Sequence, residues 1–113
     1  MKNQKHIPFS KILFVCNANL NRSPTFEKWY KQKHPHIEVK SCGIYFGYPH
    51  QLNKELLDWA DNVYVMTLKM AKHIHDRYQK EHYDKVEVIG IEDEFSPDQT
   101  ELIELIEFWD NQK

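Results

Sequence analysis

Cys16 and Arg22 lie six residues apart in the segment ILFVCNANLNRSPTFE, residues 12–27. The apolar run that ends at Cys16 is typical of a buried strand, and Ser23, which a proline follows, is a candidate helix N-cap. The residues between them are therefore predicted to connect a strand to a helix. A connection of this kind presents backbone N–H groups at the positive end of the helix dipole, an environment suited to a tetrahedral oxyanion.

The residue types in this segment suit phosphoryl transfer. A thiolate at Cys16 is a strong nucleophile, and the loop N–H groups together with Arg22 would favour that charged form. The planar guanidinium of Arg22 can hold two oxygens of a phosphoryl group and stabilise its transition-state charge. Ser23 can donate a hydrogen bond to the sulfur and ease its departure from a phosphocysteine. The segment therefore predicts a cysteine nucleophile in a phosphate-binding loop.

The rest of the chain alternates predicted strands with predicted helices. Residues 1–10 are predicted to be a polar leader, and residues 11–113 a single domain. Apolar runs and two-residue alternation predict strands over 11–16, 37–41, 62–66 and 85–91. Helical spacing of apolar side chains predicts helices over 23–34, 52–60, 68–82 and 96–109.

This alternation predicts an α/β fold in three layers, with a four-stranded parallel sheet and helices on both faces. The first and third strands are apolar throughout and belong in the centre, whereas the second and fourth alternate and belong at the edges. The predicted strand order is 2-1-3-4. The chain turns in opposite directions after the first strand, so a crevice is expected at its carboxyl end, where Cys16 lies.

Composition narrows the function and the compartment. The 113 residues carry a formal charge of -2, which gives no reason to expect a nucleic-acid partner. Two cysteines are too few for a disulfide framework, and no apolar run approaches membrane length, so a cytoplasmic protein without a membrane partner is expected. The histidines lack a matched metal-ligand spacing, and the predicted mechanism requires no metal or cofactor.

The segment VCNANLNRSPTFE resembles the phosphate loop of the low-molecular-weight protein tyrosine phosphatases, whose signature is Cys, five residues, then Arg-Ser/Thr-Pro. The short bacterial members, with CxxNxxRSPTAE, resemble it most. The similarity continues through VKSCGI, WADNVYVM and IEDEFSPDQTELIELI. It implies a phosphatase-like domain that hydrolyses protein phosphotyrosine or a small aryl phosphate and releases inorganic phosphate.

A tyrosine leaving group also needs a proton donor. Four acids follow the fourth predicted strand, at the same end of the sheet as Cys16: Glu92, Asp93, Glu94 and Asp98. The residues alone do not choose among them, although the helix dipole accounts for Asp98. The resemblance implies that Asp93 is the acid and that Phe95 forms an aromatic wall beside the substrate ring.

The resemblance assigns further binding and supporting residues. Tyr45 and Phe46, in the loop after the second strand, are candidates for the opposite wall. Ser41 and Asn19 take the places of a serine and an asparagine that support the phosphate loop in the family. The residues expected to surround the phosphate are Asn17, Ala18, Asn19, Leu20 and Asn21. Leu20 stands where phosphoarginine-selective relatives have threonine, which favours an aryl phosphate.

Cys42 suggests a redox hypothesis. If the first two strands are neighbours, Cys16 and Cys42 lie near the same strand ends, and a reversible disulfide could protect Cys16 from over-oxidation.

Two other functions remain open. A phosphate loop with Ala18, where longer relatives have glycine, and a short acid loop are also compatible with a non-catalytic oxyanion-binding module. Arsenate reduction on the same fold normally requires more spare cysteines than Cys42 provides, so it ranks last.

Overall fold

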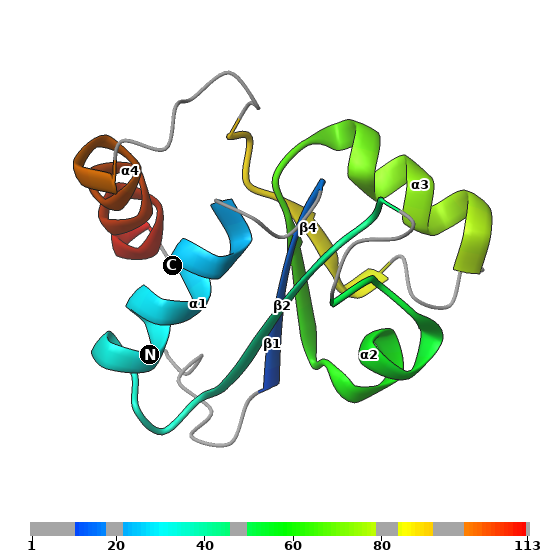
Figure 1. The fold of residues 1–113 in the computed structure, drawn as a ribbon, viewed down its shortest axis with the longest axis horizontal. Coiled ribbons are helices and arrows are strands. Elements are labelled where there is room, and N and C mark those ends of the chain that lie inside the picture. The colour runs from blue at the N-terminus through cyan, green and yellow to red at the C-terminus, as the bar shows by residue number, and fades with distance from the viewer. Residues whose placement is uncertain (1–10, 18–21, 46–49, 79–83, 92–98, 113) are drawn as a thin grey trace.

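The computed structural model describes residues 11–17, 22–45, 50–78, 84–91 and 99–112, in which strands and helices alternate (Figure 1). The strands are β1 (Lys11–Cys16), β2 (Glu38–Gly43), β3 (Asn62–Val65) and β4 (Val86–Val88). The helices are α1 (Arg22–Lys33), α2 (Lys54–Trp59), α3 (Leu68–Tyr78) and α4 (Gln99–Asn111). Each predicted element is present, and the largest differences are at the ends of elements.

The four strands form one parallel sheet in the order β2-β1-β3-β4, which confirms the prediction. α1 and α4 lie on one side of the sheet, and α2 and α3 lie on the other (Figure 1). β1 and β3 are buried almost throughout, whereas β2 and β4 have exposed positions, as edge strands do. The predicted three-layer α/β fold is therefore confirmed, and the carboxyl end of β1 lies at the centre of one edge of the sheet.

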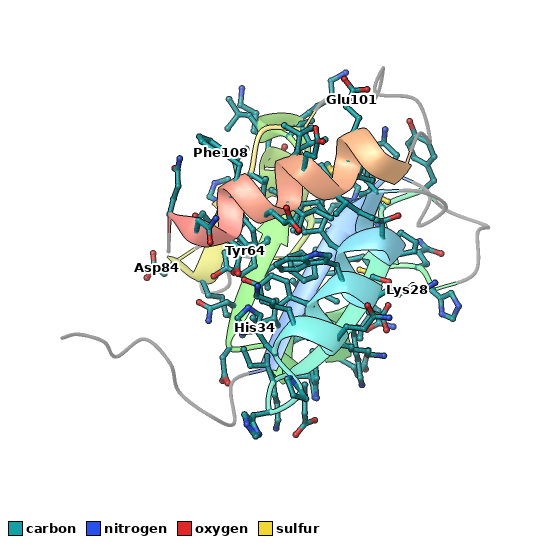
Figure 2. The ribbon with its side chains drawn as sticks, turned by 90° about the vertical axis from the view of Figure 1, so that its left-hand side faces the viewer. Lys28, His34, Tyr64, Asp84, Glu101 and Phe108 are labelled. Carbon is teal, nitrogen blue, oxygen red and sulfur yellow. The ribbon has the colours of Figure 1, made fainter. Side chains whose placement is uncertain are left out.

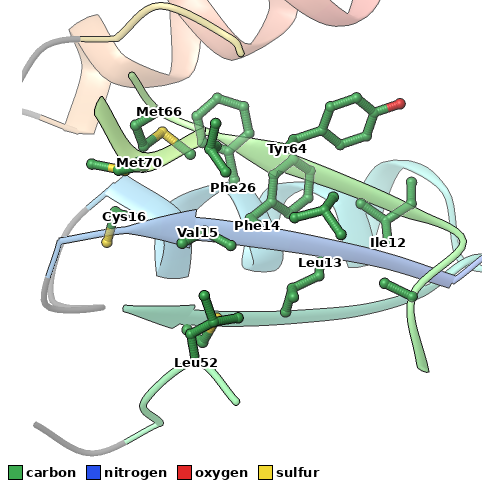
Figure 3. Close-up of a cluster of buried hydrophobic side chains, with 14 of the residues drawn as sticks. Ile12, Leu13, Phe14, Val15, Cys16, Phe26, Leu52, Tyr64, Met66 and Met70 are labelled. Atoms are coloured by element: carbon green, nitrogen blue, oxygen red, sulfur yellow. The ribbon is translucent and has the colours of Figure 1, made fainter. Parts of the chain in front are cut away.

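An aromatic cluster fills the space between the sheet and the pair α1 and α4. The ring of Phe14, which is fully buried, has its centroid 4.9 Å from that of Phe26, 5.3 Å from Tyr30 and 5.7 Å from Tyr64. Trp109 of α4 completes the cluster, 4.8 Å from Tyr64 (Figure 3 shows Phe14, Phe26 and Tyr64 together). Figure 2 looks onto this face, where α4 and α1 lie side by side. These rings hold both helices on the sheet.

β4 is shorter than the predicted strand 85–91. It ends at Val88, and Gly90 then adopts a φ of +95°, a left-handed conformation that interrupts the extended backbone. The backbone stays attached to the sheet, because the N–H of Ile89 donates to the carbonyl of Val65 over 2.8 Å. The predicted strand therefore included residues that form a turn, and this turn is hydrogen-bonded to the end of β3.

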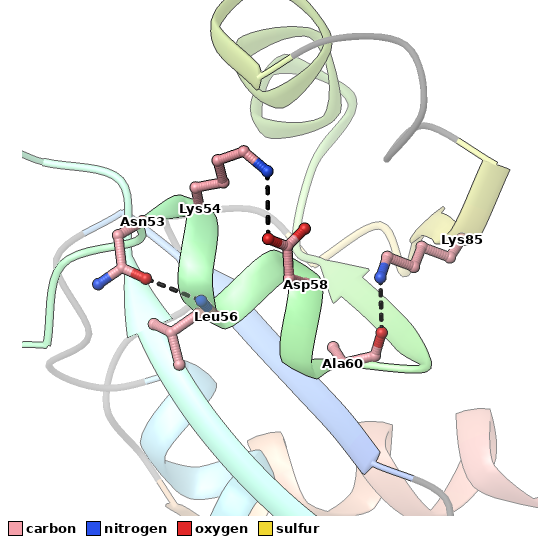
Figure 4. Close-up of polar contacts among 6 residues, drawn as sticks. All are labelled: Asn53, Lys54, Leu56, Asp58, Ala60 and Lys85. Atoms are coloured by element: carbon pink, nitrogen blue, oxygen red, sulfur yellow. Dashed lines mark hydrogen bonds and ion pairs between the residues drawn. The ribbon is translucent and has the colours of Figure 1, made fainter.

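α2 is a short helix with a side-chain cap that the sequence pattern did not identify. Asn53 precedes it in an extended conformation, and its side-chain oxygen accepts a hydrogen bond from the N–H of Leu56 over 2.8 Å (Figure 4). At the other end, the Lys85 ammonium donates to the carbonyl of Ala60 over 2.7 Å (Figure 4). The cap explains why the helix begins at Lys54, two residues after the predicted start.

Among the described residues, none of the helices combines the length and the apolar character that crossing a membrane requires.

Candidate active site

Cys16 is the last residue of β1 and is buried, at the end of the sheet where a crevice was expected. Its carbonyl accepts a hydrogen bond from the N–H of Ile44 over 3.0 Å, and the carbonyl of Asn17 accepts one from the N–H of Tyr45 over 2.8 Å. The backbone after β2 is therefore fastened to the first residues of the predicted phosphate loop.

Ser23 connects the thiol of Cys16 to β2. Its Oγ lies 2.9 Å from the Sγ of Cys16, and its hydroxyl donates to the carbonyl of Cys42 over 3.2 Å. A hydroxyl has one proton, so with the carbonyl as its acceptor Ser23 accepts from the neutral thiol. When Cys16 is a thiolate, the same proton can turn to the sulfur instead. Ser23 can therefore hydrogen-bond to Cys16 both as a thiol and as a thiolate.

This contact corrects the predicted role of Ser23 as an N-cap. α1 begins at Arg22, so Ser23 already lies inside the helix. Its hydroxyl donates to the carbonyl of Cys42 in β2 and lies beside the thiol of Cys16 at the end of β1. The first turn of α1 therefore places the hydroxyl of Ser23 beside the thiol of Cys16.

Arg22 is a buried cation, with only 4% of its surface exposed. Its Nη1 donates to the carbonyl of Ile91 over 2.7 Å, a short distance typical of a charge-assisted hydrogen bond. A buried guanidinium is costly unless its donors are satisfied, and a planar group with five donors can satisfy a fixed acceptor and an oxyanion together. Its place at the start of α1 adds the positive end of the helix dipole.

Ser41 lies on β2 and contacts α1 through Glu27. Its hydroxyl donates to a carboxylate oxygen of Glu27 over 2.5 Å, and the other carboxylate oxygen pairs with Lys31 over 2.6 Å. Glu27 was not among the predicted site residues. It belongs to the RSPTFE sequence that carried the family resemblance, and this was the available signal that it has a role beside the loop.

Tyr45 is 48% exposed, at the point where the backbone after β2 meets Asn17. An aromatic side chain in this place can contact a ligand above Cys16, so its role as a wall stays a prediction. The other predicted site residues lie outside the described residues: Ala18, Asn19, Leu20, Asn21, Phe46, Asp93 and Phe95.

The sheet register does not support the hypothesis of a disulfide between Cys16 and Cys42. Both cysteines are free and buried. Cys42 pairs with Val15, and Cys16 pairs with Gly43, so the two side chains leave their strands on opposite faces. Cysteines whose Cβ vectors point apart cannot be bridged without backbone movement. Burial also raises the pKa of the Cys42 thiol far above its ordinary value, and the charge of Cys16 adds to this effect. Cys42 is therefore held as a neutral thiol in the core.

Within the described ranges, no three or more histidine, cysteine, aspartate or glutamate side chains come together in a way that could hold a metal ion. The thiol of Cys16 and the hydroxyl of Ser23 are in contact, and the buried guanidinium of Arg22 belongs to the residue before Ser23 in the same helix. This set can bind an oxyanion and attack it.

Proteins similar to this chain are phosphatases, in agreement with an oxyanion site. No protein-family model matches the chain. The low molecular weight protein-tyrosine-phosphatase Ptp of Acinetobacter johnsonii is 34% identical over 93 residues, which take in 62% of this chain and 66% of that protein. The homologous enzyme Etp of Escherichia coli K12 is 34% identical over 56 residues, 50% of this chain and 38% of that protein. The matches thus span at most 66% of the length of these two relatives.

Solved structures extend the similarity over the whole fold. The YwlE arginine phosphatase of Geobacillus stearothermophilus has a TM-score of 0.74 and 26% identity, with 91% of this chain and 92% of that chain covered. The tyrosine phosphatase Wzb of Escherichia coli K30, solved with phosphate, has a TM-score of 0.76 and 19% identity, with 92% and 95% covered. The relatives and structural neighbours of this chain are therefore low molecular weight protein-tyrosine phosphatases of the short bacterial type, the family whose phosphate loop residues 15–27 resemble.

Proposed function

We propose that this chain is a phosphomonoesterase that hydrolyses protein phosphotyrosine, or a related aryl phosphate, through a phosphocysteine intermediate. The observation that supports it best is the contact between Cys16 and Ser23 at the junction of β1 and α1, where Arg22 is also buried. The Sγ of Cys16 lies 2.9 Å from the Oγ of Ser23. Arg22, which is buried, is the first residue of α1, the helix that contains Ser23. The names of the relatives, which are cysteine-dependent phosphatases, agree with this chemistry.

In the proposed reaction, the thiolate of Cys16 attacks phosphorus in line with the leaving oxygen. The S–P bond forms as the P–O bond to the leaving group breaks, and Asp93 gives its proton to the leaving oxygen. Arg22 and the backbone N–H groups of residues 17–21 hold the equatorial oxygens and stabilise their charge.

Water then completes the cycle. Asp93, now a carboxylate, takes a proton from the water that attacks the phosphocysteine, and the S–P bond breaks to release inorganic phosphate. The electron pair of the S–P bond leaves with the sulfur as a thiolate, and the hydroxyl of Ser23 stabilises that charge by donating a hydrogen bond while keeping its proton.

The substrate class rests on the walls beside the loop. Tyr45, Phe46 and Phe95 would enclose an aromatic ring, and Leu20 stands where phosphoarginine-selective relatives have threonine. Both points favour an aryl ester over phosphoarginine, although two structural neighbours and one curated relative are named arginine phosphatases. A phosphorylated protein is the proposed partner, and inorganic phosphate is the product.

The test is hydrolysis of para-nitrophenyl phosphate and of phosphoarginine, without added metal, by the native chain and by Cys16→Ser. We expect turnover of the aryl ester, at least about 1,000-fold lower in Cys16→Ser because the nucleophile is lost. Faster turnover of phosphoarginine would correct the substrate class. Equal turnover by Cys16→Ser would refute the mechanism, and vanadate binding without any hydrolysis would favour the oxyanion-binding module.

A further inference from the structure

In the tight turn that follows β4, two successive backbone N–H groups share one acceptor, the carbonyl of Met66. The N–H groups of Gly90 and Ile91 both donate to the carbonyl of Met66, over 2.9 and 2.8 Å. Two successive N–H groups converge in this way because Gly90 has a φ of +95°, which turns the peptide plane that follows it.

The turn ends in the contact that holds Arg22. The carbonyl of Ile91 accepts the 2.7 Å hydrogen bond from Nη1 of Arg22, a buried contact between residues 69 positions apart in the chain. Met66 in turn donates its N–H to the carbonyl of Val15 over 3.1 Å, one residue before Cys16. A chain of hydrogen bonds therefore runs from the guanidinium of Arg22 through Ile91 and Met66 to Val15, the residue before Cys16.

We propose that Gly90 is a positioning residue for Arg22. Its left-handed backbone aims the Ile91 carbonyl at the guanidinium and so fixes the plane in which Arg22 meets an oxyanion. For the identity of that oxyanion, a phosphoryl group, the inference rests on the proposed function. The consequence is that a residue with no side chain, outside the phosphate loop, sets the aim of the main cationic group of the site.

The requirement for glycine here is conformational and not steric. Among the described residues other than its two chain neighbours, none has a heavy atom within 4 Å of a Cβ placed on Gly90. The Cβ of alanine nevertheless disfavours a φ of +95°, whereas asparagine tolerates positive φ better than other side chains. Gly90→Ala and Gly90→Asn therefore form a matched pair, in which the larger side chain should be the milder change.

The experiment measures orthovanadate affinity by calorimetry and the guanidinium of Arg22 by ¹⁵N NMR, in the native chain and both variants. The chain has two arginines, so Arg77→Lys identifies the Arg22 signals. The bond to Ile91 should slow rotation of the native guanidinium and resolve its Nη signals. In Gly90→Ala we expect averaged signals and an affinity about tenfold lower, and in Gly90→Asn a smaller loss.

Thermal unfolding of each variant shows whether it is folded at the temperature of the measurement. A folded Gly90→Ala that keeps resolved Nη signals and native vanadate affinity would overturn the proposal, as would a larger loss in Gly90→Asn than in Gly90→Ala. If the native chain binds no vanadate, the proposed function fails. The NMR comparison still decides whether Gly90 positions Arg22.

Discussion

The two ends of α1 bury polar side chains in different ways. At its start, Arg22 and Ser23 donate to backbone carbonyls, that of Ile91 in the turn after β4 and that of Cys42 in β2. At its other end, Tyr30 donates to Asp110, whose second carboxylate oxygen lies 3.1 Å from Nε2 of His34. The first set is anchored by the sheet and faces a thiol, whereas the second set consists of side chains that satisfy one another.

This difference separates catalysis from stability. Both carbonyls belong to backbone that is hydrogen-bonded to the sheet, so the groups bound to them are positioned before a ligand arrives, as catalysis requires. The Tyr30–His34–Asp110 network instead joins α1 to α4 beside the aromatic cluster. Changes at the start of α1 should therefore alter chemistry more than stability, and changes at its other end should do the reverse.

The largest expected effect on stability is that of Phe14→Ala. Phe14 contacts four other rings and is fully buried, so its removal should lower the free energy of unfolding by about 3–5 kcal/mol. Chemical denaturation measures this loss, with Phe108→Ala as the control. Phe108 is 65% exposed on α4 (Figure 2), and its loss should cost less than about 0.5 kcal/mol. Similar losses in the two variants would contradict the account of the aromatic cluster.

Ser23→Ala should lower turnover strongly and stability only slightly. The variant loses the hydroxyl that serves the departing sulfur, so hydrolysis of the phosphocysteine should slow by about 10- to 100-fold. Stopped-flow measurement with para-nitrophenyl phosphate should then show a burst of product followed by slow turnover. The unfolding free energy should change by only about 1–2 kcal/mol, since the hydroxyl loses its neutral hydrogen bonds with the carbonyl of Cys42 and the thiol of Cys16. Native turnover without a burst would remove Ser23 from the mechanism.

Tyr30→Phe should have the smallest effect on activity, and its effect on stability should depend on pH. Burial and the neighbouring Asp110 raise the pKa of Tyr30 above its ordinary value of 10.0. Below about pH 10 the stabilisation is complete, because both states keep the proton. Above it the unfolded state loses the proton first, so Tyr30 should reduce the unfolding free energy by about 1.4 kcal/mol per pH unit.

Urea denaturation between about pH 9 and 11 can isolate this contribution, because Tyr30→Phe lacks the titrating group. The variant should show a weaker decline of stability with pH than the native chain. Identical slopes would mean that Tyr30 does not keep its proton in the folded state. Vanadate affinity at neutral pH should be unchanged, since Tyr30 lies at the far end of α1 from Cys16.

Hydrophobic pattern was sufficient to predict the strand order. The apolar strands ending at Cys16 and Met66 had to lie in the centre, and the alternating strands had to lie at the edges. The position of Cys16 and Arg22 at a strand-to-helix junction followed from the same pattern together with the family resemblance.

The contacts that arrange the site could not be predicted in this way. The acceptor for Arg22 is a backbone carbonyl, and no residue type marks which carbonyl will face it. Ser23 before a proline has the signature of an N-cap, but α1 begins one residue earlier, at Arg22. The predicted contact between the hydroxyl of Ser23 and the sulfur of Cys16 is present, whereas its second acceptor, the carbonyl of Cys42, was not predicted. The proposed disulfide failed for a similar reason, since a shift of one residue in register moves a side chain to the other face.

The most direct test of the account is to trap the phosphoryl group during turnover. The native chain would be mixed with para-nitrophenyl phosphate, quenched in acid within the first turnover, digested and examined by mass spectrometry. The account predicts one phosphoryl group on the sulfur of Cys16, more of it in Ser23→Ala and none in Cys16→Ala. Turnover with no phosphocysteine, or with the phosphoryl group on another residue, would contradict Cys16 as the nucleophile.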